Sequence, residues 1–216
     1  MDRTYVLLCT LFSVLIVTGN LVYQKFVAID ILSIHVFELS VGAIFYPVTF
    51  LLTDLISEFY GSKLAAFCVK LSICMNVIVV MALYFMASLD ATAWSNIDNA
   101  TFQKIFGMYG VNFVGSIIAC YVSQNIDIKL YLFIRKITNS KHLWLRNNVS
   151  TAISLLIDTV IIISFLVAFK VLPSNQMLPL IINSYLFKLF FTICSTPIFY
   201  LGFYGIRYIR RRDNIS

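Results

Sequence analysis

Four of the ionisable side chains within long apolar stretches of this 216-residue chain are spaced so that they could do chemistry: Asp54, Glu58, Asp158 and Lys188. A charged side chain near the centre of a bilayer costs about 2.5–3.5 kcal/mol on insertion scales, so such residues mark ligand sites, ion pathways or proton relays. Asp54 and Glu58 are four residues apart, which places both carboxylates on one face of a helix. They are either functional acids or caps at the cytoplasmic end of a span that bind lysines on the headgroup side.

Asp158 and Lys188 are the sharpest pair. Counted from the ends of their apolar stretches, Asp158 lies about 14 Å deep from one face and Lys188 about 15 Å deep from the other. Both therefore fall near the midplane of the membrane, on consecutive helices, where opposite charges offset the cost of burial. The pair is either a structural ion pair that fixes helix packing or part of a substrate site.

Further polar residues form lines at helical spacing within four apolar stretches. Aligned with an ionisable residue, hydroxyl and amide side chains are typical of a bundle interior or a wet cavity rather than of a lipid-facing surface. The four lines are Ser13, Asn20 and Gln24; Asn112, Ser116, Ser123 and Asp127; Asn147, Thr151, Ser154 and Asp158; and Ser184, Lys188, Thr192 and Ser195.

The ligand that these groups suit is polar and planar. A carboxylate accepts two parallel hydrogen bonds from an N–H and an adjacent amino group, the edge that guanine-like bases present. Amide side chains can bond a neighbouring carbonyl, and aromatic rings can stack on a heterocycle. Residue types and spacing alone predict a small-molecule transporter with a polar ligand.

The elements that must position these residues are membrane helices. The chain is 60% hydrophobic and 12% charged, whereas soluble domains are about 45–50% apolar and about 25% charged; its mean hydropathy is +0.89. We expect an all-α integral membrane protein, a single domain over residues 1–216. The six predicted spans are about 5–24, 34–58, 64–88, 108–128, 149–171 and 178–206.

The distribution of basic residues predicts the topology. The N-terminus, the second and fourth loops and the C-terminus carry twelve lysines and arginines, whereas the other side carries Lys25, Lys104 and Lys170. By the positive-inside rule both termini are cytoplasmic. The net charge of +6 is thus a topology signal and a contact with anionic lipid, and we expect no nucleic-acid partner.

Other function classes find no support in the sequence. It contains no GxSxG, HExxH or GxGD-type signature, so we expect neither an enzyme nor a bound cofactor or metal. A purely structural membrane protein would not need charged residues at the midplane.

Two segments resemble the signatures of a known family. TFLLTDLISEFYGSK (49–63) and KHLWLRNNVSTAISLLIDTV (141–160) are similar to the two recurrent motifs of the queuosine precursor transporter family, also called the vitamin uptake transporter family. The resemblance continues through residues 106–131 and 196–201. Val149 departs from it, since a small residue is expected there. The matching positions are Thr53, Asp54, Ser57, Glu58, Tyr60, Gly61, Trp144, Leu145, Arg146, Asn147, Ser150, Thr151, Asp158 and Thr159.

The resemblance implies a six-helix, multi-pass importer in the bacterial inner membrane. Its substrates would be 7-deazaguanines (preQ0, preQ1 or queuine) for queuosine modification of tRNA, and its fold would be similar to the substrate-binding components of energy-coupling-factor transporters. Such a component is the alternative function. The first span, Tyr5 to Tyr23, lacks the AxxxA pattern of those components, which favours a stand-alone carrier.

Roles follow as hypotheses. Asp158 would bind the N1/2-amino edge of the base, with Asn147 or Asn20 bonding its carbonyl and Thr151 nearby. Lys188 would hold Asp158 ionised in the empty site. Asp54 and Glu58 would form a cytoplasmic gate or a proton-linked switch with Arg146.

Overall fold

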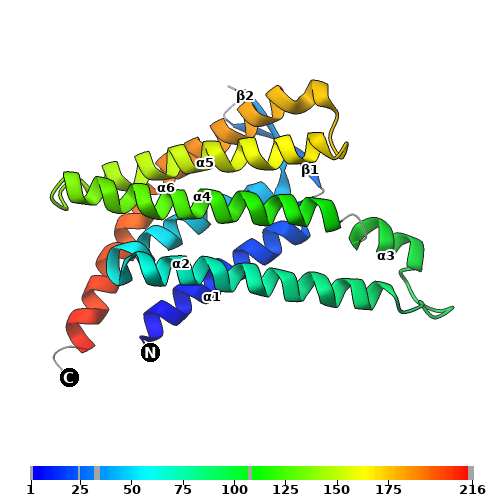
Figure 1. Cartoon of the computed structure of the whole chain (residues 1–216), viewed down its shortest axis with the longest axis horizontal. Coiled ribbons are helices and arrows are strands. Elements are labelled where there is room, and N and C mark those ends of the chain that lie inside the picture. The colour runs from blue at the N-terminus through cyan, green and yellow to red at the C-terminus, as the bar shows by residue number, and fades with distance from the viewer. Residues whose placement is uncertain (1, 24, 32–34, 107–108, 214–216) are drawn as a thin grey trace.

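The computed structural model describes residues 2–23, 25–31, 35–106 and 109–213, and Gln24 of the first polar line lies outside them. Figure 1 shows long helices packed lengthwise, with a small β hairpin at one end. The elements in chain order are α1 (Arg3–Leu21), β1 (Phe26–Ile31), β2 (His35–Ser40), the 3-10 turn η1 (Val41–Ala43), α2 (Tyr46–Ala87), α3 (Asn99–Phe106), α4 (Tyr109–Ile137), α5 (Leu143–Ala168), the 3-10 turn η2 (Ser174–Gln176) and α6 (Met177–Asp213). The predicted all-α membrane class is confirmed, with the hairpin as an addition.

Helix α2 consists of two arms that fold back on each other at Gly61 (Figure 1). Gly61 has φ 80° and ψ 174°, a backbone conformation that is essentially restricted to glycine. The predicted break between the second and third spans therefore lies where expected. Five described helices are long and apolar enough to cross a membrane; counting the arms of α2 separately gives six helices, and six crossings remain a prediction.

The region before α2 differs from the prediction. We expected a turn from Lys25 to Asp30 and a helix from about residue 34, but these residues pair as antiparallel strands, from Phe26 opposite Ser40 to Ile31 opposite His35. The reason is a period-two pattern. Ile29, Phe37 and Leu39 pack into one apolar cluster, and Asp30, Glu38 and Ser40 alternate with them along the strands.

Helix ends also extend past the predicted spans. Helix α4 continues to Ile137 and α5 begins at Leu143, so the predicted polar connection of residues 129–148 shortens to residues 138–142. The basic side chains at these ends can extend from helical backbone into the headgroup region. The predicted loop of residues 89–104 likewise holds most of α3.

The connections group into two ends of the molecule. In Figure 1 both termini, the bend at Gly61 and the turn between α4 and α5 lie at one end, which we call the termini end. The hairpin, α3 and the connection between α5 and α6 lie at the other, the hairpin end. This grouping is the one that the basic residues predict, and a cytoplasmic termini end remains a prediction.

Polar side chains face inward and apolar ones outward. On α5 the line Asn147, Thr151, Ser154 and Asp158 is buried, whereas Ile153, Leu156 and Val160 are exposed. The α6 line of Ser184, Lys188, Thr192 and Ser195 is buried as well. Because this pattern inverts that of a soluble helix, the exposed surface is suited to lipid.

Candidate functional site

The predicted pair of opposite charges is present. Lys188 Nζ lies 3.0 Å from Asp158 Oδ2, and both side chains are at most 5% exposed. Lys188 also donates to Thr159 Oγ1 over 3.1 Å. The contact forms because α5 and α6 pack side by side, with their polar lines facing each other.

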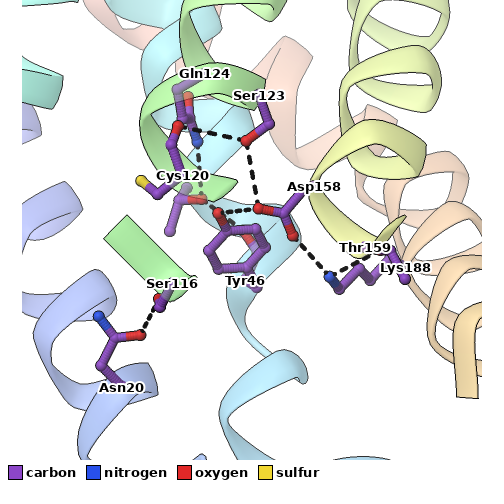
Figure 2. Close-up of polar contacts among 10 residues, drawn as sticks. Asn20, Tyr46, Ser116, Cys120, Ser123, Gln124, Asp158, Thr159 and Lys188 are labelled. Atoms are coloured by element: carbon purple, nitrogen blue, oxygen red, sulfur yellow. Dashed lines mark hydrogen bonds and ion pairs between the residues drawn. The ribbon is translucent and has the colours of Figure 1, made fainter. Parts of the chain in front are cut away.

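The second carboxylate oxygen of Asp158 accepts hydrogen bonds from two hydroxyl groups (Figure 2). Tyr46 Oη donates to Asp158 Oδ1 over 2.7 Å, and Ser123 Oγ donates to the same atom over 3.3 Å. The Tyr46 ring also lies beneath the Lys188 ammonium, with 4.9 Å from Nζ to the ring centroid. Sequence reasoning missed Tyr46, because a tyrosine at the start of an apolar helix carries no signal of its partner.

A cavity adjoins this pair on the side of the hairpin end. Helices α1, α2, α4, α5 and α6 contribute to its wall, as does the hairpin through Phe26 and Ser40. The polar and aromatic residues that line it are Asn20, Tyr23, Phe26, Ser40, Tyr46, Ser116, Asp158, Thr159, Ser184 and Lys188. The cavity thus combines one carboxylate, one ammonium, one amide and several aromatic rings.

Asn20 is held in place by two side chains. Its Oδ1 accepts from Ser116 Oγ over 2.6 Å, and its Nδ2 donates to Asn76 Oδ1 over 3.0 Å. The polar faces predicted for the first and fourth spans therefore meet in the cavity wall. Asn76 belongs to none of the four polar lines predicted from the sequence.

A close approach of two backbones shapes the same wall. A Cβ added to Gly42 would clash with the Gly19 carbonyl oxygen, and both glycines line the cavity. The turn η1 can therefore press against α1 only because neither position carries a side chain.

Asn147 and Thr151 do not line the cavity. Asn147 is eleven residues before Asp158, about 16 Å along the helix, which is too far for both to contact one planar base. Of the two amides predicted to bond the ligand's carbonyl, Asn20 lines the cavity and Asn147 lies toward the termini end. Thr151 lies on the same side and contacts Asp54.

Glu58 and Arg146 form a second buried ion pair, near the termini end. Arg146 Nη2 lies 2.8 Å from Glu58 Oε1, with side chains 2% and 8% exposed. Tyr131 Oη donates to Glu58 Oε2 over 3.0 Å, and Arg135 Nε lies 3.7 Å from the same oxygen. Arg146 also donates to the carbonyl oxygen of Ser140 in the α4–α5 turn over 3.1 Å. These contacts tie α2, α4 and α5 together.

Asp54 is not part of that ion pair. Within the described ranges it forms no ion pair; its Oδ2 accepts one long hydrogen bond, 3.5 Å, from Thr151, and its Oδ1 has no hydrogen-bond partner. The acidic groups that interact with it are Asp127 of α4 and Glu58. The grouping of Asp54 with Glu58 and Arg146 therefore holds only for the last two, since Asp54 lies one turn deeper in α2.

Known proteins provide an independent comparison. Residues 40–202 match the family described as "Putative vitamin uptake transporter". The chain is 32% identical over 166 residues to a protein of Bacillus subtilis (strain 168) named "Probable queuosine precursor transporter". The aligned region covers 74% of this chain and 70% of that relative. No solved structure matches the chain.

Proposed function

Because this chain belongs to the vitamin uptake transporter family, we propose that it imports a queuosine precursor, a 7-deazaguanine such as preQ0, preQ1 or queuine. It is a multi-pass membrane transporter and not an enzyme. The name of the Bacillus relative supports the substrate class. The observation that carries the proposal is a buried carboxylate, Asp158, on the wall of a cavity within the helix bundle.

Asp158 would bind the edge of the base that carries N1–H and the 2-amino group. Its two oxygens now accept from Tyr46 Oη and Lys188 Nζ, over 2.7 and 3.0 Å. A substrate edge with two parallel donors can replace either partner without leaving an oxygen unsatisfied. The site is therefore suited to a ligand that presents paired N–H donors.

The other cavity groups match the rest of such a ligand. The Asn20 amide would donate to the ring carbonyl, at the cost of its 3.0 Å bond to Asn76. The rings of Tyr23, Phe26 and Tyr46 line the cavity, and a flat heterocycle stacks on such rings with about 1–3 kcal/mol per base. Lys188 would hold Asp158 ionised and in place when no substrate is bound.

The two ends of the molecule would act as alternating barriers. The cavity lies toward the hairpin end, which we assign to the outside, and the Glu58–Arg146 pair would close the path to the cytoplasm. We assign six spans with cytoplasmic termini in a bacterial inner membrane. Import would then require the Glu58–Arg146 contacts to open after the substrate has bound.

The experiment is the queuosine content of tRNA in a bacterial strain that can neither make nor import the precursors. Cells expressing this chain are fed preQ0, preQ1 or queuine separately, and one compound at low concentration should restore queuosine. Asp158→Asn should abolish the restoration, whereas the matched control Asp90→Asn, at an exposed loop position, should retain it.

Failure with all three compounds, despite expression in the membrane, would contradict the proposal for a stand-alone importer. Co-purification with ATPase subunits in that case would favour the alternative, a substrate-binding component of an energy-coupling-factor transporter.

A further inference from the structure

A second pair of acids lies deep in the bundle, apart from the cavity. Asp54 of α2 and Asp127 of α4 are both 0% exposed. The two helices pack side by side at this level, because Thr53 donates to Gln124 over 2.8 Å and Tyr131 donates to Glu58 over 3.0 Å. The two carboxyl groups are therefore within range of each other. Neither forms an ion pair with any residue in the described part of the chain. Two ionised carboxylates in such a place would repel each other at low dielectric, which disfavours full ionisation of the pair.

The surroundings of the pair offer oxygen atoms but no positive charge. Asp54 Oδ1 and both oxygens of Asp127 lack a hydrogen-bond partner, as do Asn147 Oδ1 and Ser154 Oγ of the α5 polar line. The hydroxyls of Ser150, Thr151 and Ser154 face the two acids and can each donate one hydrogen to them. Hydroxyl donors supply no positive charge, so two ionised carboxylates here would remain uncompensated.

The nearby cations are already engaged. Arg146 and Arg135 contact Glu58. The ionisable groups that face the two acids are Glu58, one turn along α2, and Tyr131, whose hydroxyl donates to Glu58. Each of these two groups is either neutral or negatively charged, so neither can balance a negative charge on Asp54 or Asp127.

We propose that Asp54 and Asp127 bind one exchangeable proton between them, and that this proton is the coupling ion of transport. The hydroxyl of the protonated carboxyl donates to the partner carboxylate, which leaves a single, shared negative charge. The inference rests on the proposed function, which it deepens by naming the ion that accompanies the substrate.

The position of the pair favours coupling over a purely structural role. Thr151, which contacts Asp54, is seven residues before Asp158, about 10 Å along α5, and Glu58 is one turn further toward the termini end. The acids therefore lie between the cavity and the Glu58–Arg146 pair. Loss of the proton to the cytoplasm leaves two adjacent carboxylates that repel, which pushes α2 away from α4 beside the gate; a proton from the outside restores the closed contact.

The test has two parts, both on the purified full chain in lipid vesicles. Infrared spectroscopy at neutral pH should show the carbonyl stretch of a protonated carboxyl group in the wild type, and this band should be absent from Asp54→Asn/Asp127→Asn. Asp90→Asn is the matched control and should keep the band. A wild type without the band would overturn the proposal, whether or not the vesicles transport a deazaguanine.

The second part measures uptake of labelled preQ1, or of whichever precursor restores queuosine. A pH gradient, acid outside, should drive accumulation by the wild type but not by Asp127→Asn, while Asp127→Asn still exchanges labelled for unlabelled substrate. Retained exchange shows that the variant is folded. Full gradient-driven accumulation in Asp127→Asn, or accumulation driven by sodium and not by protons, would overturn the proposal. Absence of both uptake and exchange in the wild type refutes the proposed function instead, and the infrared band then decides the proton site alone.

Discussion

Substitution of both members of the Asp158–Lys188 pair separates a structural ion pair from a substrate site. Asp158→Asn leaves the Lys188 ammonium, whose side chain is 5% exposed, without its counter-charge. Removing one partner of a buried pair costs about 3–5 kcal/mol. The single variant should therefore lose substantial thermal stability in detergent, and the double variant Asp158→Asn/Lys188→Met should regain most of it because no unpaired charge remains at this site.

Substrate affinity should behave differently. Each hydrogen bond to an ionised carboxylate contributes about 1.5–3 kcal/mol. Asparagine keeps one acceptor oxygen but presents a donor to the second substrate N–H, so the loss of at least one such bond corresponds to a Kd weaker by roughly 10- to 10²-fold or more. Methionine at position 188 cannot restore such a bond. The double variant should thus be stable and still bind weakly.

The assay is a pair of measurements on each purified variant, namely the thermal midpoint and a binding titration with the active precursor. If the double variant recovers both stability and affinity, Asp158 serves only to neutralise Lys188, and the assignment of the substrate site is refuted. Lys188→Met alone is the matched single control, and it should lower stability for the complementary reason, an unpaired carboxylate.

Three further substitutions test other parts of the structure. Glu58→Gln removes the counter-charge of Arg146 and should lower stability by about 3–5 kcal/mol, measured as a thermal midpoint; an unchanged midpoint would show that the ion pair is dispensable. Gly42→Ala forces a Cβ against the Gly19 carbonyl oxygen, so it should displace η1 and reduce uptake at least tenfold, whereas wild-type uptake would contradict the close contact. Gly61→Ala meets no atom within 4 Å but requires a strained backbone, so it should cost about 1–3 kcal/mol of unfolding free energy; a stabilised protein would argue against the bend.

The sequence predicts those parts of the site that depend on positions within one helix, and not those that depend on how two helices pack. Spacing within a helix and depth from its ends correctly paired Asp158 with Lys188, because both quantities follow from the 1.5 Å rise per residue. Residue spacing and depth do not give the rotation of one helix relative to its neighbour. For that reason the partner of Asp54 was assigned within its own motif, whereas the structure places it beside Asp127 of α4.

The same distinction explains the fold. The bend at Gly61 was predicted because glycine is a local signal. The hairpin is not predicted because the alternation that marks strands covers only six residues in each strand. Tyr46 joins the site only through tertiary packing, at the N-terminus of α2.

The ion pair at the centre of the bundle has a consequence for the return half of the transport cycle. With Lys188 3.0 Å from Asp158, the vacant substrate site carries no net charge, so this site adds no uncompensated ion when the empty carrier changes its facing direction. Under the proposal, the charge that moves on the return is that of the Asp54–Asp127 pair alone. We therefore expect accumulation in vesicles that contain no substrate at the start, at a rate that depends on pH.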